Sequence, residues 1–359
     1  MNNKYCVIMA GGIGSRFWPI SRTSRPKQFL DILGTGKSFI RHTYERFAKI
    51  VPPENFLVVT NQSYASLVLE EIPELKPHQV LGEPLGRNTA PCIAYAAFRL
   101  LAVNPDAEMI VTPSDHLILN EDEFCKAIEE AVGYVREHAV LMTIGIKPSR
   151  PDTGYGYIQI EPGKGKHNPI QKVKTFTEKP NLEMAKVFVE SGEFFWNAGI
   201  FIWKVIDILH ALRRHLPETE QLFASIGQYY NTDSEAEHVA QVYSQCRAIS
   251  IDFGIMEKAD NVCVRCSDFG WSDIGTWGSL YQYSDKDENG NVTGGDTALY
   301  DTRDCIVKMP EGKLAVVEGL SDYIVVENDN VLMICPKSNE QNIKKFIDDA
   351  RYSKGDKYI

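Results

Sequence analysis

Residues 4–31 read KYCVIMAGGIGSRFWPISRTSRPKQFLD, and this stretch decides the fold. After Lys4 the first residues are apolar, which predicts a buried β-strand followed by a glycine-rich loop. The loop is cationic, although the 359-residue protein carries a formal net charge of −10. No acid precedes Asp31, whereas the stretch holds Lys4, Arg16, Arg22, Arg25 and Lys27. A cationic, glycine-rich loop at the end of a strand predicts a local anion site.

Strand-like and helix-like segments alternate from this stretch as far as residue 146. Short runs rich in Val and Ile predict strands at residues 4–10, 55–60, 79–83, 108–115 and 139–146. Amphipathic segments predict helices at residues 38–50, 88–104 and 121–137. Strands that alternate with helices indicate a parallel sheet covered on both faces. We therefore expect an α/β fold with a doubly wound, mixed but mainly parallel sheet.

The pattern changes from about residue 290. Short β runs at residues 305–309, 313–319, 322–328 and 330–336 follow one another with turn residues between them and no helix. They predict either a short β-solenoid or a small β-meander, closed by an amphipathic helix at residues 339–352. A polar stretch at residues 284–292 marks the boundary. We expect a catalytic domain at residues 1–284 and a β-solenoid-like C-terminal domain with its terminal helix at residues 292–359.

Composition excludes several classes of partner. The negative net charge argues against bulk attraction to nucleic acid or to an anionic membrane. No run approaches the roughly 18 apolar residues that span a bilayer, and the first apolar run is too short for a signal peptide. Eight cysteines are scattered, several of them in apolar runs. We expect a cytoplasmic protein that binds neither nucleic acid nor membrane.

The glycine-rich loop fits a polyphosphate better than a dinucleotide. Ligands of doubly wound sheets bind beyond the carboxyl ends of the strands, which is where this loop lies. Backbone N–H groups of the loop, together with Arg16 and Lys27, suit several negative charges. The GK[ST] of a Walker A loop is missing, and so is the acid that binds ribose in dinucleotide folds. Without the basic residues, a simple tight turn would be an equally good interpretation.

The stretch at residues 11–30 resembles the signature of the sugar-1-phosphate nucleotidylyltransferases, with Arg25 where the family pattern has lysine. Further motifs stand in the order seen in mannose-1-phosphate guanylyltransferases: GRNTAPCIAYAAF, TPSDHLI, DTGYGYI, FTEKPN, FFWNAGIFIW and FGWSDIGTW. The resemblance spans residues 4–359. It implies a Rossmann-like nucleotidyltransferase fold and a GTP-dependent reaction in which mannose 1-phosphate attacks the α-phosphorus of GTP. The products would be GDP-mannose and pyrophosphate. Such transfers need positioning and charge stabilisation rather than a general base.

The resemblance implies roles for the residues of the loop. Arg16 would neutralise the β and γ phosphates, and Lys27 would bridge the attacking phosphate and the α-phosphate. Arg22 and Arg25 are as well explained by solvated loop charges as by phosphate contacts. Three glycines would let the loop wrap the nucleotide: Gly11, Gly12 and Gly14.

Base recognition is expected in the segment GEPLGRNTAP at residues 82–91. Guanine offers N1–H and N2–H₂ as donors, so an acceptor such as Glu83 or a backbone carbonyl can select it. Asn88 and Thr89 would also bind nucleotide. Both stand where a helix is expected to begin, and for Asn88 helix capping explains the residue equally well.

The sugar phosphate is expected to bind through Gly156, Glu178, Lys179 and Asn197. A carboxylate and an amide suit vicinal hydroxyl groups, and Lys179 would pair with the phosphate. Without the resemblance, Glu178 and Lys179 would be interpreted as an exposed strand end before Pro180.

Two aspartates are expected to hold Mg²⁺. Asp115 ends a strand, where a carboxylate can ligate Mg²⁺ against phosphates. The resemblance implies that Asp273 is the second ligand. The alternative for Asp273 is a helix cap, which needs no metal.

Other assignments stay open at this stage. A guanylyltransferase for another sugar 1-phosphate, such as manno-heptose 1-phosphate, would look similar. A non-catalytic regulatory subunit of the same fold and a dinucleotide-dependent oxidoreductase are the alternatives from other classes. Some relatives carry an isomerase domain, which the length of this chain leads us not to expect. A homodimer is plausible because the small β domain has strand edges to pair.

Overall fold

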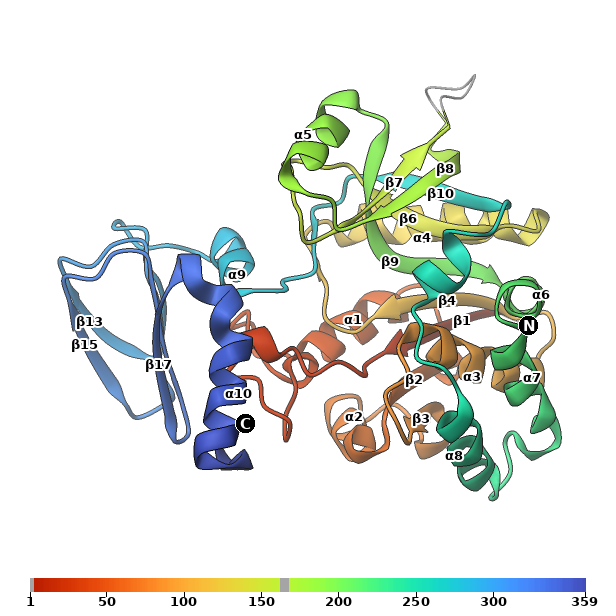
Figure 1. Ribbon diagram of the computed structural model, residues 1–359, viewed down its shortest axis with the longest axis horizontal. Helices are drawn as coiled ribbons and strands as arrows, with labels where there is room; N and C mark the ends of the chain where they lie inside the picture. Colours follow the sequence, from red (N-terminus) through yellow and green to blue (C-terminus); the bar gives the residue numbers. More distant parts are fainter. Residues whose placement is uncertain (1–2, 162–167) are drawn as a thin grey trace. The chain divides into compact units, whose positions relative to one another are not determined.

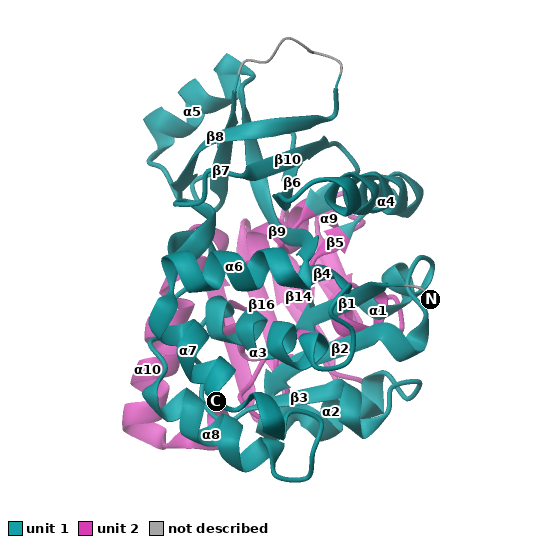
Figure 2. Ribbon diagram, turned by 90° about the vertical axis from the view of Figure 1, so that its right-hand side faces the viewer, with its two compact units in different colours: residues 1–11, 43–114, 118–271 teal, residues 12–42, 115–117, 272–359 magenta. Residues whose placement is uncertain are grey.

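The computed structural model describes residues 3–161 and 168–359. The chain divides into two compact units that interleave along the sequence (Figure 2). Unit 1 comprises residues 1–11, 43–114 and 118–271, and unit 2 comprises residues 12–42, 115–117 and 272–359. The grouping of the glycine-rich segment with the C-terminal strands was not predicted from the sequence.

A nine-stranded sheet forms the centre of unit 1 (Figure 1). Its order is β3-β2-β1-β4-β9-β6-β10-β8-β7. The strands are β1 (Lys4–Met9), β2 (Phe56–Asn61), β3 (Val80–Glu83), β4 (Glu108–Pro113), β6 (Leu141–Ile146), β7 (Gly156–Ile160), β8 (Ile170–Glu178), β9 (Phe194–Lys204) and β10 (Val262–Ser267).

The predicted α/β fold with a mixed sheet is confirmed, but more strand pairs are antiparallel than predicted. Strands β3, β2, β1 and β4 are parallel, as the alternating pattern indicated. Strand β9 then runs antiparallel between β4 and β6, and β8 and β7 are antiparallel as well. Parallel pairing is therefore concentrated in the half of the sheet from β3 to β4, and β6 and β10 form a further parallel pair. The carboxyl ends of β3, β2, β1 and β4 lie at one edge of the sheet.

Helices pack against the sheet of unit 1. They are α2 (Ala65–Glu71), α3 (Thr89–Leu101), α4 (Glu121–Glu137), α5 (Leu182–Ser191), α6 (Val205–His215), α7 (Pro217–Ser225) and α8 (Glu235–Gln245), with α1 (Phe39–Ala48) beginning in unit 2 and ending in unit 1. Val7 and Val111 belong to the cluster that α3, α6 and α8 bury. Ile8, which is also fully buried, points to the opposite face because successive strand residues alternate.

Unit 2 is built on a short solenoid of parallel strands. Strands β12 (Val292–Gly294), β14 (Ile306–Lys308) and β16 (Tyr323–Asn328) stack in parallel, as do β13 (Asp296–Tyr300) and β15 (Leu314–Glu318). Strand β17 (Val331–Pro336) returns antiparallel to β16. Parallel stacking of successive turns favours the solenoid over the meander. Helices α9 (Trp277–Tyr283) and α10 (Ile343–Lys354) complete the unit.

One apolar cluster joins the glycine-rich segment to the solenoid within unit 2. Phe17 and Ile32 pack in it with Val292, Ile306 and Ile324 from β12, β14 and β16. Burial of such side chains stabilises the unit by roughly 1.5–3 kcal/mol each. The loop that follows β1 is therefore held by residues near the end of the chain.

Two short strands lie where the chain passes between units, β5 (Leu117–Ile118) and β11 (Trp271–Ser272). Within residues 3–161 and 168–359, no helix has the length and apolar character needed to cross a membrane.

Candidate active site

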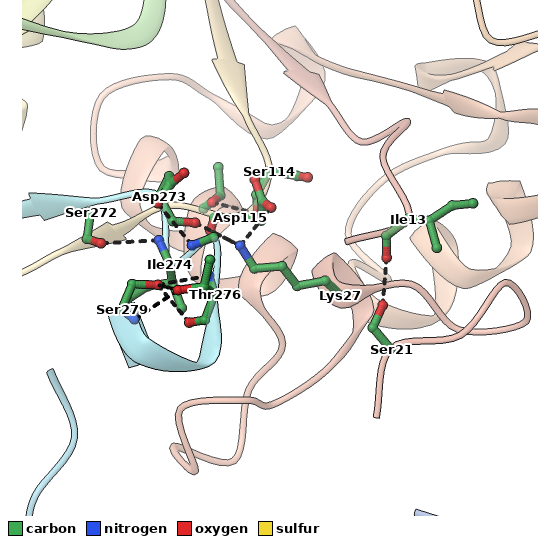
Figure 3. Close-up of polar contacts among 12 residues, drawn as sticks. Ile13, Ser21, Lys27, Ser114, Asp115, Ser272, Asp273, Ile274, Thr276 and Ser279 are labelled. Carbon is green, nitrogen blue, oxygen red and sulfur yellow. Dashed lines mark hydrogen bonds and ion pairs between the residues drawn. The ribbon is translucent and has the colours of Figure 1, made fainter. Parts of the chain in front are cut away.

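Lys27 is the centre of a buried polar cluster in unit 2, shown in Figure 3. Only 2% of the residue is exposed. Its Nζ donates to Asp115 Oδ2 at 2.9 Å and to the backbone carbonyl of Asp273 at 2.8 Å. The rings of Phe17 and Phe39 lie 5.6 and 4.9 Å from the ammonium. We call Lys27, Asp115 and Asp273 the lysine cluster.

Asp115 is held in its ionised form by this arrangement. Burial acts to raise the pKa of Asp115, but the positive charges of Lys27 and His116 outweigh it, so the pKa lies below its ordinary value. The second acid, Asp273, accepts a hydrogen bond from Gly275 N at its Oδ1, with a distance of 2.9 Å. Both residues predicted to bind metal therefore contact one ammonium group, Asp115 through its carboxylate and Asp273 through its backbone carbonyl. Their roles toward a metal stay predictions.

The glycine-rich loop folds back onto Lys27. Gly14 has a φ of 67°, and a Cβ at this position would lie only 2.4 Å from the Cβ of Lys27. The backbone N–H of Lys27 donates to the carbonyl of Ile13 at 3.2 Å. An alanine at residue 14 would both clash and adopt a disfavoured φ. A Cβ on Gly12, by contrast, would meet nothing within 4 Å.

The arginines of the loop differ in what they contact. Arg16, on the short helix η1 (Ser15–Phe17), has a buried Nε without a hydrogen-bond partner among the described residues. Arg22 is 9% exposed and donates to the carbonyl of Asn328 at 2.8 Å and to Asn330 Oδ1 at 3.0 Å. Arg22 thus holds the turn between β16 and β17 by hydrogen bonds. The sequence did not predict this structural role. The Nε of Arg25 donates to the carbonyl of Phe29.

Glu83 lies at the end of β3 in unit 1, close to the start of the glycine-rich stretch. It is 6% exposed, and a Cβ on Gly11 would lie 3.4 Å from its Oε2. The hydroxyl of Tyr243 donates to Oε1 at 2.9 Å. Burial raises the pKa of Glu83 to about 7, and the Tyr243 hydrogen bond offsets only part of the rise. Glu83 is therefore a poorly solvated acceptor.

Asn88 and Thr89 stand at the beginning of α3, where both have structural partners. Asn88 is the N-cap of α3, and its side chain accepts from Thr89 N at 2.8 Å. Thr89 Oγ1 accepts from the backbone N–H of Ile251 at 2.8 Å. The capping alternative for Asn88 is thus present in the structure. Nucleotide contacts of the two residues stay predictions.

The predicted sugar-phosphate residues gather in unit 1. Gly156 on β7 pairs with Glu178 on β8, and a Cβ on Gly156 would lie 2.5 Å from Glu178 Oε2. Asn197 on β9 donates through Nδ2 to Asp252 Oδ1 at 2.8 Å. We call Gly156, Glu178, Asn197 and Asp252 the carboxamide cluster. Lys179 forms an ion pair with Glu178, and 60% of the Lys179 side chain is exposed.

Two residues of these arrangements were missed by sequence reasoning. Tyr243 and Asp252 contact Glu83 and Asn197 from 160 and 55 residues away along the chain. Neither stands in a motif with recognisable spacing. The only signal for Asp252 in the sequence is an acid within the segment SIDFGIM at residues 250–256. This segment follows neither a helical nor a strand-like pattern.

The donor set of the lysine cluster fits a magnesium ion in part. Carboxylate oxygens of Asp115 and Asp273 are ligands that Mg²⁺ prefers, and phosphates and waters normally supply the rest of its shell. The described residues contain no group of three or more His, Cys, Asp or Glu side chains placed for a metal. A metal held by protein side chains alone is therefore not indicated, whereas one shared with phosphate oxygens fits two aspartates.

Two family models and several curated proteins match this chain. The family model described as nucleotidyl transferase matches residues 5–290, and the model described as MannoseP isomerase/GMP-like beta-helix domain matches residues 295–349. A protein of Salmonella montevideo named mannose-1-phosphate guanylyltransferase is 35% identical over 98% of this chain and 75% of its own length. One of Escherichia coli O157:H7, named mannose-1-phosphate guanylyltransferase 2, is 35% identical over 98% of this chain and 74% of its own length.

A solved structure agrees with these matches. The protein of Thermus thermophilus named mannose-1-phosphate geranyltransferase superposes with a TM-score of 0.87. It is 29% identical in sequence, and the match covers 97% of this chain and 99% of that one. The similarity therefore extends over both compact units.

Proposed function

We propose that the chain, which belongs to the nucleotidyl transferase family and is a nucleotidyltransferase, transfers GMP from GTP to mannose 1-phosphate. The products are GDP-mannose and pyrophosphate. The names of its curated relatives support this assignment. The observation that carries it is the lysine cluster, because a buried ammonium beside two aspartates and a glycine-rich loop suits the transfer of a nucleotidyl group between phosphates.

Phosphate chemistry is assigned to the loop and to Lys27. Lys27 binds the phosphate of the sugar and the α-phosphate of GTP, and its charge stabilises the transition state of an in-line attack. Arg16, whose buried Nε lacks a partner in the described residues, binds the β and γ phosphates of the leaving pyrophosphate. Gly11, Gly12 and Gly14 let the backbone approach the nucleotide. The attacking phosphate oxygen is already ionised, so no side chain has to remove a proton.

Asp115 and Asp273 are the residues that hold Mg²⁺ in this proposal. Nucleotidyltransferases of this family generally use Mg²⁺. When bound, the ion neutralises phosphate charge and orients the triphosphate. Asp115 is suited to this role because its pKa is below the ordinary value, so the carboxylate stays ionised at neutral pH.

Guanine recognition is assigned to Glu83, with Asn88 and Thr89 close by on α3. The Oε1 of Glu83 is occupied by Tyr243, which leaves Oε2 toward Gly11. An ionised Oε2 accepts hydrogen bonds from N1–H and N2–H₂ of guanine, and adenine offers no such pair of donors. Selection against ATP follows because a poorly solvated carboxylate is left without a donor.

Sugar recognition is assigned to Gly156, Glu178 and Asn197, and Lys179 binds the phosphate of the sugar. The absence of a side chain at Gly156 makes room for the Glu178 carboxylate. The carboxylate and the amide then serve hydroxyl groups of the sugar.

We also propose a cytoplasmic homodimer. All eight cysteines are free thiols, which a reducing compartment maintains. Four apolar side chains of the solenoid are 56–65% exposed and would suit a second copy: Leu314, Val316, Leu332 and Ile334. Multi-angle light scattering of the purified protein measures the oligomeric state directly.

Pyrophosphate release from GTP and mannose 1-phosphate tests the proposed reaction. We expect release that requires both substrates, and we expect GTP to exceed ATP, UTP and dTTP in kcat/KM. A panel of sugar 1-phosphates, including glucose 1-phosphate and manno-heptose 1-phosphate, identifies the preferred acceptor. No release with any pair would refute the proposal and favour a non-catalytic subunit.

A further inference from the structure

Asp252 occupies an unusual position in the backbone. It is the first residue of η7 (Asp252–Met256), a π-helical turn that follows α8. Single π-helical turns are rare and occur frequently at functional sites. A Cβ on Gly254 would lie 2.8 Å from Leu216 Cδ1, so the turn packs tightly against the connection between α6 and α7. The position of Asp252 is therefore set by packing and not by solvent.

Asn197, the hydrogen-bond partner of Asp252, is held in one orientation. Its Oδ1 accepts from Gly199 N at 3.1 Å and from Thr143 Oγ1 at 3.3 Å. The amide nitrogen therefore faces Asp252, with a distance of 2.8 Å to Oδ1. The pairing of β6 with β9 is irregular between Thr143 and Gly145, next to Asn197. Such irregularities re-aim side chains and are common beside active sites.

Asp252, which is half-buried, shares with Glu83 the lack of an ion pair among the described residues, and both differ in this from three other acids of unit 1. Glu108, Glu220 and Glu235 each form an ion pair with an arginine, which is the ordinary way to bury a carboxylate. No ion pair within residues 3–161 and 168–359 involves Asp252, whose carboxylate accepts a hydrogen bond from the side chain of Asn197. Burial and the neighbouring Glu178 raise the pKa of Asp252, and the hydrogen bond from Asn197 and the positive charge of Lys179 offset only part of this rise. An acid kept in such surroundings calls for an explanation by function.

We propose that Asp252 is a sugar-binding residue that acts together with Glu178 and Asn197 and accepts a hydrogen bond from a hydroxyl group of the sugar 1-phosphate. The inference rests on the proposed function, because it takes Glu178 and Asn197 as the sugar site. Hydroxyl groups are neutral donors, so they satisfy a buried carboxyl group without adding a cation. A site of this kind discriminates against a sugar that lacks the hydroxyl, because the carboxyl group is then left unpaired.

Asp252→Asn tests the inference with little structural disturbance. Asparagine keeps the shape of the side chain and can still accept from Asn197. Loss of a hydrogen bond to a charged acceptor is expected to raise the KM for mannose 1-phosphate about 10- to 100-fold. The KM for GTP should stay unchanged. Glu257→Gln is the matched control, since Glu257 is an exposed acid close to the same turn, and it should leave both values unchanged.

Mono-deoxy analogues of mannose 1-phosphate separate recognition from a structural role. If Asp252 accepts from one hydroxyl, wild type and Asp252→Asn will use the analogue that lacks this hydroxyl equally well, and they will differ on the other analogues. An equal loss on every analogue, an equal rise in the KM for GTP, or no loss at all would overturn the inference. Thermal unfolding of both variants verifies that they are folded.

The same experiment keeps the two proposals apart. The wild type is first assayed with the full panel of sugar 1-phosphates and GTP. If it prefers another sugar, the analogues of that sugar replace those of mannose, and only the sugar assignment changes. If it releases no pyrophosphate with any sugar, the proposed function fails. Isothermal titration with mannose 1-phosphate then measures the contribution of Asp252, and equal affinity of wild type and Asp252→Asn would refute it.

Discussion

Replacing Glu83 with glutamine should stabilise the folded protein above pH 7. Burial raises the pKa of Glu83 from its ordinary value of 4.5 to about 7. An acid whose pKa rises on folding contributes its full stability below the unfolded pKa and loses it as the pH rises through the folded pKa. One unit of pKa corresponds to about 1.4 kcal/mol. The loss in wild type therefore reaches about 3 kcal/mol at pH 8 and stays under about 1 kcal/mol at pH 5.

Glutamine removes this loss because it does not ionise. Its amide oxygen can still accept from the hydroxyl of Tyr243, which donates to Glu83 at 2.9 Å in wild type. Its amide nitrogen needs a new acceptor, and this reduces the gain. We expect Glu83→Gln to raise the free energy of unfolding by roughly 1–3 kcal/mol at pH 8 and by much less at pH 5.

Urea denaturation at pH 5, 6, 7 and 8 measures the effect, with tryptophan fluorescence as the probe. Tyr243→Phe is the matched control, because it removes the hydrogen bond that lowers the pKa of Glu83. It should destabilise the protein more at pH 8 than at pH 5. A gain for Glu83→Gln that is the same at pH 5 and pH 8 would refute the reasoning.

The proposed role of Glu83 in guanine binding leads to a second expectation for the same variant. Glu83→Gln should lose the preference for GTP over ITP, which lacks the N2 amine.

Further predictions concern the lysine cluster and the loop around it. Lys27→Ala and Arg16→Ala should each lower kcat about 10²- to 10³-fold while the protein stays folded, and wild-type turnover in both would contradict the phosphate assignment. Gly14→Ala should destabilise the protein by roughly 1–3 kcal/mol because of its φ of 67° and its contact with Lys27; Gly12→Ala, measured in the same urea titration, should not. Asp273→Asn keeps an acceptor for Gly275 N, so its stability should hold while activity collapses or demands much more Mg²⁺; an unchanged Mg²⁺ titration would exclude a ligand role. Truncation after Ser284 removes the strands that Phe17 packs on and should yield aggregated protein in size-exclusion chromatography, and a monodisperse, active product would contradict this.

The first half of the fold was predictable because its signals are local. Residues 121–137 were expected to form a helix, and α4 has these bounds. Asn120 caps it by accepting from Glu123 N, a pattern visible in the sequence. The position of β9 was not predictable, since its nearly continuous apolar run carries no mark of the strands between which it inserts.

The attachment of the glycine-rich segment to the solenoid escaped prediction for a different reason. Trp18 Nε1 donates to the carbonyl of Tyr358 at 2.8 Å, across a separation of 340 residues. Arg22 reaches the turn at Asn328 in the same way. Contacts of this range depend on the folded path of the chain and leave no periodic trace. The sequence showed a basic loop, but it did not show which of its arginines are used by the fold.

The residues of the candidate site were found where a motif held them and missed where tertiary pairing did. Lys27 and Asp115 lie in separate motifs, and the structure joins them directly. Tyr243 and Asp252 lie outside the motifs and were missed, although each is bound to a predicted residue. A motif marks the residue that is proposed to meet the substrate. The group that orients this residue can come from any element that packs behind it.

The acids of the candidate site differ between the two units in the partners that satisfy them, and this difference bears on what each acid can bind. In unit 2, Asp115 is paired with an ammonium, which lowers its pKa and keeps it ionised and able to share a cation with phosphates. In unit 1, Glu83 and Asp252 are satisfied by a hydroxyl and an amide, and burial raises the pKa of both. Acids of this second kind gain most from neutral N–H and O–H donors, because such donors restore the lost solvation without a counter-charge. A guanine edge and a sugar hydroxyl are donors of that kind, so the proposed function assigns charge neutralisation and substrate selection to chemically distinct sets of acids.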